Sequence, residues 1–118
     1  MKKTSPMSGI YKIYPVKLIE ISGWLIAEHF GNEEKEFKNL KNESVLVDWS
    51  HIGKISLSQG DAASAVENIF PGTSKIKPLN SSSNSDMTVL RLTMNDYLIL
   101  CQPGIEDKLI EKIDSKIT

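Results

Sequence analysis

The sequence has few of the residues that build disulfide frameworks and metal sites. Its 118 residues include one cysteine and two histidines. A single cysteine excludes an internal disulfide and a cysteine-based zinc site. His29 and His51 do not have the spacing of a histidine metal-ligand pair. The sequence therefore predicts no metal centre.

An excess of charge of either sign is also missing. Fourteen lysines and arginines face fifteen aspartates and glutamates, so the net charge is -1. Lys75, Lys77 and Arg91 are too few and too scattered for a nucleic-acid surface. No apolar run reaches the ~18 residues of a membrane span. The first nine residues, MKKTSPMSG, lack the apolar segment of a secretory signal. We expect a cytoplasmic protein with no nucleic-acid or membrane partner.

The remaining composition is that of a globular protein, with 40% hydrophobic and 25% charged residues. A chain of this length can bury one modest core. Residues 1–9 carry lysine, serine, proline and glycine with little to pack, and we expect a mobile tail there. Residues 10–118 are expected to form a single module.

Three segments have the residue pattern of β-strands. Residues 12–30 are rich in β-formers and are interrupted by Ser22 and Gly23, which predicts two strands around a bend. Residues 45–47 form a short apolar run that predicts a buried strand. Residues 55–57 alternate with serines, as in a half-buried strand.

The second half of the chain contains the clearest hairpin. Residues 88–92 and 97–101 have strand composition and are joined by a short polar turn. The serine- and asparagine-rich segment before them, residues 74–86, is expected to be a mobile loop.

Three helices complete the predicted fold. They are expected over residues 33–41, 62–70 and 105–117, and the last has apolar residues on one face. The order of elements predicts an α+β fold, with an antiparallel sheet and two or three helices on one face. The expected core residues are Leu18, Ile21, Trp24, Val45, Val47, Ile55, Leu57, Val66, Ile69, Val89, Leu98, Leu100, Leu109 and Ile113.

Asp48, Ser50 and His51 lie within four residues and allow two interpretations. Ser50 could act as a nucleophile with His51 as its base. Adjacent residues on an extended strand point to opposite faces, however, which opposes this pairing. We therefore favour the alternative, in which Asp48 and Ser50 satisfy backbone donors where the chain turns.

Other candidate residues also favour structural roles. Trp24 and Trp49 are expected in the core, with a ligand-pocket wall as the alternative. Asp86 is interpreted as a solvated loop acid, and Cys101 as an inert buried thiol. The residues by themselves indicate no catalytic constellation.

Several short motifs nevertheless follow one another in a familiar order. They are Ile21–Trp24, Glu28–Gly31, Val47–Ile55, Leu57–Ala62, Ser74–Pro78, Arg91–Leu92 and Asn95–Leu100. In order and spacing this string resembles the amino-terminal region of the glycine-cleavage T-protein, the tetrahydrofolate-dependent aminomethyltransferase. The resemblance implies one half of a folate-binding pseudo-dimer. Residues at family-motif positions, expected to be structural, are Gly23, Trp24, Asp48, Ser50, His51, Gly60 and Asp61.

The chain also departs from the family pattern. The resemblance covers about a third of the family's length, and residues 79–85 replace a longer family segment. The family's pair of aspartates falls at Ser85 and Asp86, so only Asp86 has the matching type. The resemblance thus implies Asp86 as a folate contact and tetrahydrofolate as a cofactor, and we assign no catalytic residue.

A second resemblance is closer in outline. The gamma subunit of heterotetrameric sarcosine oxidase is similar to a shortened T-protein, and it has a hairpin matched here by Leu92, Asn95–Leu100 and Pro103. Such subunits accompany catalytic partners.

Three functional hypotheses follow from these resemblances. The first is a non-catalytic accessory subunit of one-carbon amine metabolism that docks on a larger catalytic chain. The second is one half of a split aminomethyltransferase, and the third is a self-associating module without the family chemistry. All three imply a protein partner, either an identical chain or a larger one. Open sheet edges and surplus apolar residues favour such a partner, and we expect the hairpin of residues 12–30 at the interface.

Overall fold

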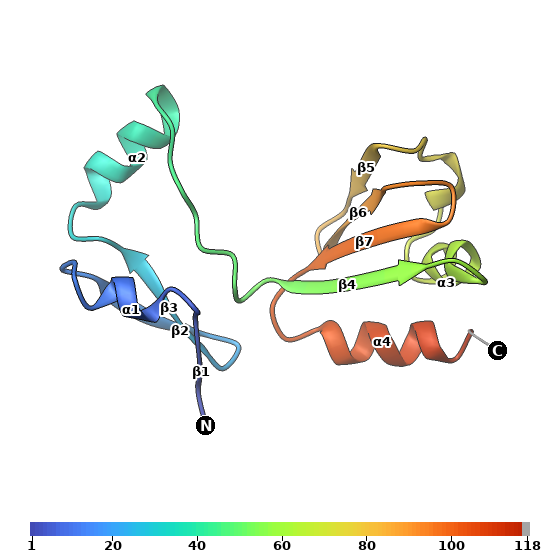
Figure 1. Cartoon of the computed structure of the whole chain (residues 1–118), viewed down its shortest axis with the longest axis horizontal. Helices are drawn as coiled ribbons and strands as arrows, with labels where there is room; N and C mark the ends of the chain where they lie inside the picture. Colours follow the sequence, from blue (N-terminus) through green and yellow to red (C-terminus); the bar gives the residue numbers. More distant parts are fainter. Residues whose placement is uncertain (117–118) are drawn as a thin grey trace. The chain divides into compact units, whose positions relative to one another are not determined.

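The computed structural model describes residues 1–116 and divides into two compact units (Figure 1). The first unit is Met1–His51 and the second begins at Ile52. Each unit has its own β-sheet. The sequence predicts one module over residues 10–118, and the described chain divides into two units between His51 and Ile52.

The first unit contains a small mixed sheet. Its strands are β1 (Lys3–Thr4), β2 (Lys17–Ile21) and β3 (Trp24–His29), in the order β1-β3-β2. β2 and β3 are antiparallel, while β1 runs parallel to β3. The turn between β2 and β3 requires positive φ angles, 48° at Ser22 and 80° at Gly23. The predicted bend at this dipeptide is therefore confirmed.

Residues 1–9 pack more than the sequence indicates. Lys3 and Thr4 pair with Trp24 and Leu25 of β3, and the Lys3 amide donates to the Gly23 carbonyl at 2.8 Å. Ser5 is only 2% exposed, because its hydroxyl lies in the polar cluster described below. The helix α1 (Ser8–Tyr11) begins before the expected end of the tail.

The helix α2 (Glu33–Asn42) confirms the predicted helix start. Asn32 caps it, since its side-chain oxygen accepts from the Lys35 amide at 2.9 Å. Acids in the first turn and Lys41 in the last turn complement the helix dipole.

The predicted buried strand at residues 45–47 is wrong. No strand lies between Asn42 and Gly53, and Leu46 is fully exposed. An apolar run forms a strand only where a neighbouring strand can accept its hydrogen bonds. No strand of the small sheet pairs with this run.

The second unit contains an antiparallel four-stranded sheet. Its strands are β4 (Gly53–Ser58), β5 (Asn80–Ser83), β6 (Met87–Arg91) and β7 (Asp96–Cys101), in the order β4-β7-β6-β5. The helices α3 (Ala62–Ile69) and α4 (Glu106–Asp114) pack on one face of it. The α+β fold class is confirmed, as are β4, α3 and the β6–β7 hairpin. Ile117, the last residue of the predicted C-terminal helix, lies outside the described residues.

The hydrophobic core belongs to the second unit. Val66, Val89, Leu109 and Ile113 are buried as predicted. The prediction for β7 is wrong by one residue, because Tyr97, Ile99 and Cys101 face the helices while Leu98 and Leu100 point to the opposite face. Because side chains alternate between the two faces of a strand, an error of one residue assigns every side chain to the wrong face. Expected core residues that are exposed instead are Leu18, Val45 and Val47.

The segment 74–86 contains regular structure where a loop was predicted. A short 3-10 helix, η1, spans Thr73–Lys75, and β5 pairs with β6. The serines of β5 have a poor strand propensity. They nevertheless form a strand, because their backbone groups pair with those of β6.

Candidate functional site

The main polar cluster of the first unit is centred on Asp48. One carboxylate oxygen, Oδ2, accepts from the hydroxyls of Ser5 and Tyr11. The other, Oδ1, accepts from the Ser50 amide at 2.9 Å and the Ser50 hydroxyl at 2.5 Å. The Met7 amide donates to Ser5 Oγ at 2.9 Å. The cluster therefore ties the first eleven residues to the segment that follows α2.

The electrostatics of Asp48 match this arrangement. Burial alone would raise its pKa, but the hydrogen bonds from Ser5, Ser50 and Tyr11 together hold the pKa well below its usual range. The pKa of Tyr11 is raised, first by burial and then by its bond to Asp48. Asp48 is thus a permanently charged acceptor, which suits a structural clamp better than proton transfer.

The structure does not form the Ser50–His51 dyad. The Ser50 hydroxyl donates to Asp48. His51 Nδ1 is buried without a hydrogen-bond partner among the described residues. Asp48 satisfies the Ser50 amide, as the favoured interpretation of the sequence predicts.

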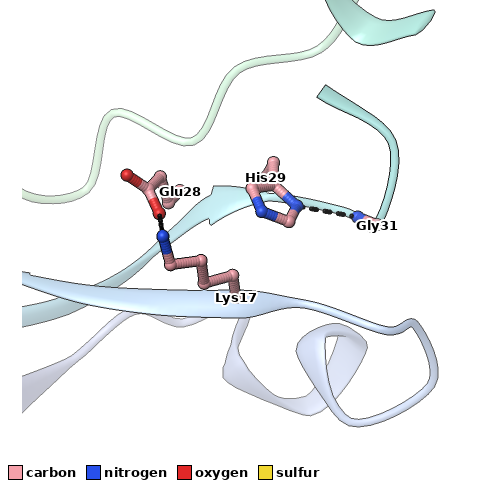
Figure 2. Close-up of polar contacts among 4 residues, drawn as sticks. All are labelled: Lys17, Glu28, His29 and Gly31. Atoms are coloured by element: carbon pink, nitrogen blue, oxygen red, sulfur yellow. Dashed lines mark hydrogen bonds and ion pairs between the residues drawn. The ribbon is translucent and has the colours of Figure 1, made fainter. Parts of the chain in front are cut away.

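An apolar groove of about 590 Å³ lies in the first unit between β3, α2 and the segment after α2. Its exposed apolar side chains are large. Carboxylates line its rim, and Glu28 pairs with Lys17 of β2 at 2.6 Å (Figure 2). The large apolar side chains lining the groove are Phe30, Phe37, Leu40, Val45, Leu46, Val47 and Trp49.

The neighbouring motif Glu28–Gly31 is held by local contacts. The Gly31 amide donates to His29 Nδ1 at 3.1 Å (Figure 2). The Phe30 amide donates to Glu36 of α2 at 2.6 Å. A Cβ on Gly31 would lie 2.8 Å from the Pro15 ring. The motif therefore shapes the turn from β3 into α2.

Asp86 lies in the turn between β5 and β6, exposed to solvent. Asn84 organises this turn, since its side-chain oxygen accepts from the amides of Asp86 and Met87 at 2.8 and 2.9 Å. The backbone carbonyl of Asp86 accepts from Gln102 at 2.9 Å. Its carboxylate oxygen Oδ1 accepts from the Ser85 hydroxyl at 3.3 Å, and Asp86 does not line the groove of the first unit.

The remaining motif residues lie in or next to turns. Trp24 is half-buried with the Lys3 ammonium 5.5 Å from its ring centre. Trp49 is 56% exposed on the groove, so its predicted core position is wrong. Gly60 has a φ of 52° and precedes Asp61, the residue at which α3 starts.

Sequence reasoning missed two polar side chains of the second unit that hold loops by hydrogen bonds. Glu67 accepts from the amides of Gly72 and Ser74 at 2.6 and 3.0 Å, and these bonds lower its pKa to about 2. Arg91 is 9% exposed and donates to the carbonyls of Ile76 and Met94 at 2.8 and 2.9 Å. Glu67 holds the nearby loop of residues 72–74, whereas Arg91 also bonds the Ile76 carbonyl, 15 residues away.

Two further features concern the described residues only. No group of three histidine, cysteine, aspartate or glutamate side chains among residues 1–116 could hold a metal ion. Over the same range, the helices are too short or too polar to cross a membrane.

Two comparisons with known proteins, one by sequence and one by structure, both find aminomethyltransferases. No protein-family model matches the chain. The aminomethyltransferase of Thermoanaerobacter pseudethanolicus is 32% identical over 112 residues, which cover 93% of this chain and 27% of the relative. That of Bacillus subtilis is 26% identical over 113 residues, covering 93% of this chain and 28% of the relative. The chain therefore spans less than a third of these relatives.

The fold is also shared with a solved structure. The glycine cleavage system aminomethyltransferase T from Bartonella henselae superposes with a TM-score of 0.81 at 17% identity, over 98% of this chain and 36% of that one. The chain thus shares its α+β fold with that structure. Its resemblance to the amino-terminal part of glycine-cleavage aminomethyltransferase is confirmed.

Proposed function

We propose that this chain is a non-catalytic accessory module of one-carbon amine metabolism that docks on a larger catalytic chain, as the gamma subunit of sarcosine oxidase does. The observation that carries the proposal is the distribution of apolar side chains. Among the described residues, thirteen of the seventeen exposed large apolar side chains lie in Met1–His51. In the same unit only Tyr11 and Ile26 are buried apolar residues. Such a surface is typical of an interface.

The apolar groove is the proposed docking surface. Leu46 is fully exposed and Val47 is 65% exposed, so burial of both would remove a large apolar area from water. The predicted role of the residue 12–30 hairpin is compatible with this, since Ile26 to Glu28 of β3 form one wall of the groove.

The test is purification of the native complex. The tagged chain, expressed in its own organism, should recover a flavin-dependent amine oxidase or a longer T-protein-like chain, identified by mass spectrometry. The double variant Leu46→Ser, Val47→Ser should lose that partner. Leu79→Ser is the matched control, because Leu79 is 87% exposed in the second unit. Recovery of no partner of this class, or equal recovery with the double variant, contradicts the proposal.

The split aminomethyltransferase is the second candidate, favoured by the shared name of the relatives and by the open position of Asp86. Aminomethyl transfer requires a closed site that positions an acid against the folate. We expect the isolated chain to show no turnover with tetrahydrofolate and an aminomethyl donor. Turnover that disappears in Asp86→Asn would favour the split enzyme.

A further inference from the structure

Three of the four sheet edges carry features that oppose pairing with another chain. β1 pairs over only two residues. β2 carries Lys17 and Glu20 and is interrupted by a bulge beside Lys17. β5 is four residues long and follows Leu79, whose φ of 66° turns the chain sharply. Short strands, charges and bulges are the usual protection of an edge.

The fourth edge, β4, lacks this protection. It has six residues, Gly53–Ser58, with no proline, no bulge and one charged residue, Lys54. Within the described chain it has a strand neighbour on one side only, β7 (Figure 1). Its residues alternate between exposed polar and half-buried apolar side chains.

The direction of the β4 backbone groups follows from the ladder with β7. The Gln59 amide donates to the Asn95 carbonyl at 2.9 Å, one step beyond the paired residues Ser58 and Asp96. Residues in an antiparallel ladder alternate between facing the partner and facing away. The N–H and C=O groups of Ser56 and Ser58 therefore point to the open edge.

We propose that two copies of this chain pair through β4, antiparallel, about a two-fold axis at Ser56, to form one continuous sheet. Ser56 then lies opposite Ser56 of the second copy, and each donates to and accepts from the other. Ile55 lies opposite Leu57 of the second copy, so the half-buried apolar residues of the two cores meet on one face. This inference is independent of the proposed docking function.

The side-chain pattern selects this register. A shift by one residue would place apolar side chains opposite polar ones on both faces. A shift by two residues would shorten the paired segment by the same amount. The register at Ser56 pairs residues 54–58 throughout.

The charges agree with the same register. Lys54 would lie opposite Ser58 of the second copy, whose neighbour on β7 is Asp96. Strand spacing places Lys54 and that aspartate roughly 10 Å apart between backbones, within reach of the lysine side chain. The two lysines themselves would lie at opposite ends of the paired segment.

Disulfide trapping tests the register directly. A hydrogen-bonded pair on the axis has Cα atoms about 5.5 Å apart, within the range of a disulfide. Under mild oxidation Ser56→Cys should give a covalent dimer, and a mixture of Lys54→Cys and Ser58→Cys chains should give one as well. Lys54→Cys alone should not, and Ser81→Cys on β5 is the control for the opposite edge. The native Cys101 is 3% exposed and should stay unlinked.

Light scattering supplies the second measurement. The wild-type chain should have twice the monomer mass, and Ser56→Pro should be monomeric with an unchanged circular dichroism spectrum. Proline at this position removes a donor only from the open edge. A monomeric wild-type chain, or Ser81→Cys dimers as abundant as Ser56→Cys dimers, would overturn the proposal. If Ser56→Pro does not fold, the trapping results decide alone.

Discussion

Tyr11 and Asp48 are 37 residues apart in the chain and share a hydrogen bond in the first unit. The Asp48 carboxylate also accepts from Ser5 and Ser50, so one side chain joins the start of the unit to its end. Because Asp48 is ionised and its donors are hydroxyls and an amide, each bond is stronger than a neutral one.

Asp48→Asn should loosen this connection. The amide group cannot accept from the Ser5 and Tyr11 hydroxyls as the carboxylate does, which should destabilise the unit by about 1–3 kcal/mol. Faster hydrogen exchange at the Ser50 and Met7 amides would report the loss. Asp86→Asn, at an exposed turn, should leave these amides unchanged. Equal exchange in the two variants would contradict the structural role of Asp48.

The lowered pKa of Glu67 predicts that the folded protein loses stability in acid. Its folded-state pKa of about 2 lies below its usual value of 4.5, so the folded state favours the ionised form. Its contribution is complete above pH 4.5 and is lost as the pH falls towards 2. Wild type should therefore exceed Glu67→Gln in unfolding free energy at neutral pH, and the difference should shrink in acid. Urea unfolding against pH measures it, with Glu111→Gln on α4 as the control.

Gly53→Ala should destabilise the second unit. A Cβ at this position would lie 2.4 Å from Cys101 Sγ and from Glu106 Cγ, closer than atoms can approach. Overpacking of this kind costs about 1–3 kcal/mol. Gly9→Ala is the control, since nothing lies within 4 Å of its added Cβ. Thermal melting of the two variants should separate them, and similar melting temperatures would argue against the close approach of α4 to β4.

Cys101 should react slowly with thiol reagents. It is 3% exposed, and burial followed by the Glu106 charge raises its pKa, so little thiolate is present at neutral pH. Labelling of the native chain should be slow and should accelerate in urea. Rapid labelling without urea would mean that β7 opens locally.

The sequence predicts local elements better than long-range contacts. The Asn32 cap and the Ser22-Gly23 turn depend on neighbouring residues, and both are confirmed. The bond from Arg91 to the Ile76 carbonyl joins residues 15 positions apart that only the fold brings together. No periodicity identifies such contacts in advance.

The sequence also predicts the burial of apolar segments incorrectly. Residues 45–47 have the composition of a buried strand, yet they line an open groove. Leu98 and Leu100 are as apolar as Ile99, so composition could not decide which face of β7 meets the helices. For the candidate site, the cluster of Asp48 and Ser50 was anticipated, but its partners Ser5 and Tyr11 were not.

The position of the core has a consequence for synthesis. Residues 1–51 leave the ribosome first, but the buried apolar cluster forms only from Ala62 onward. The early segment thus emerges with most of its large apolar side chains uncovered, and folding of its own sheet covers few of them. Exposed apolar surface of this kind makes a partly synthesised chain prone to aggregation.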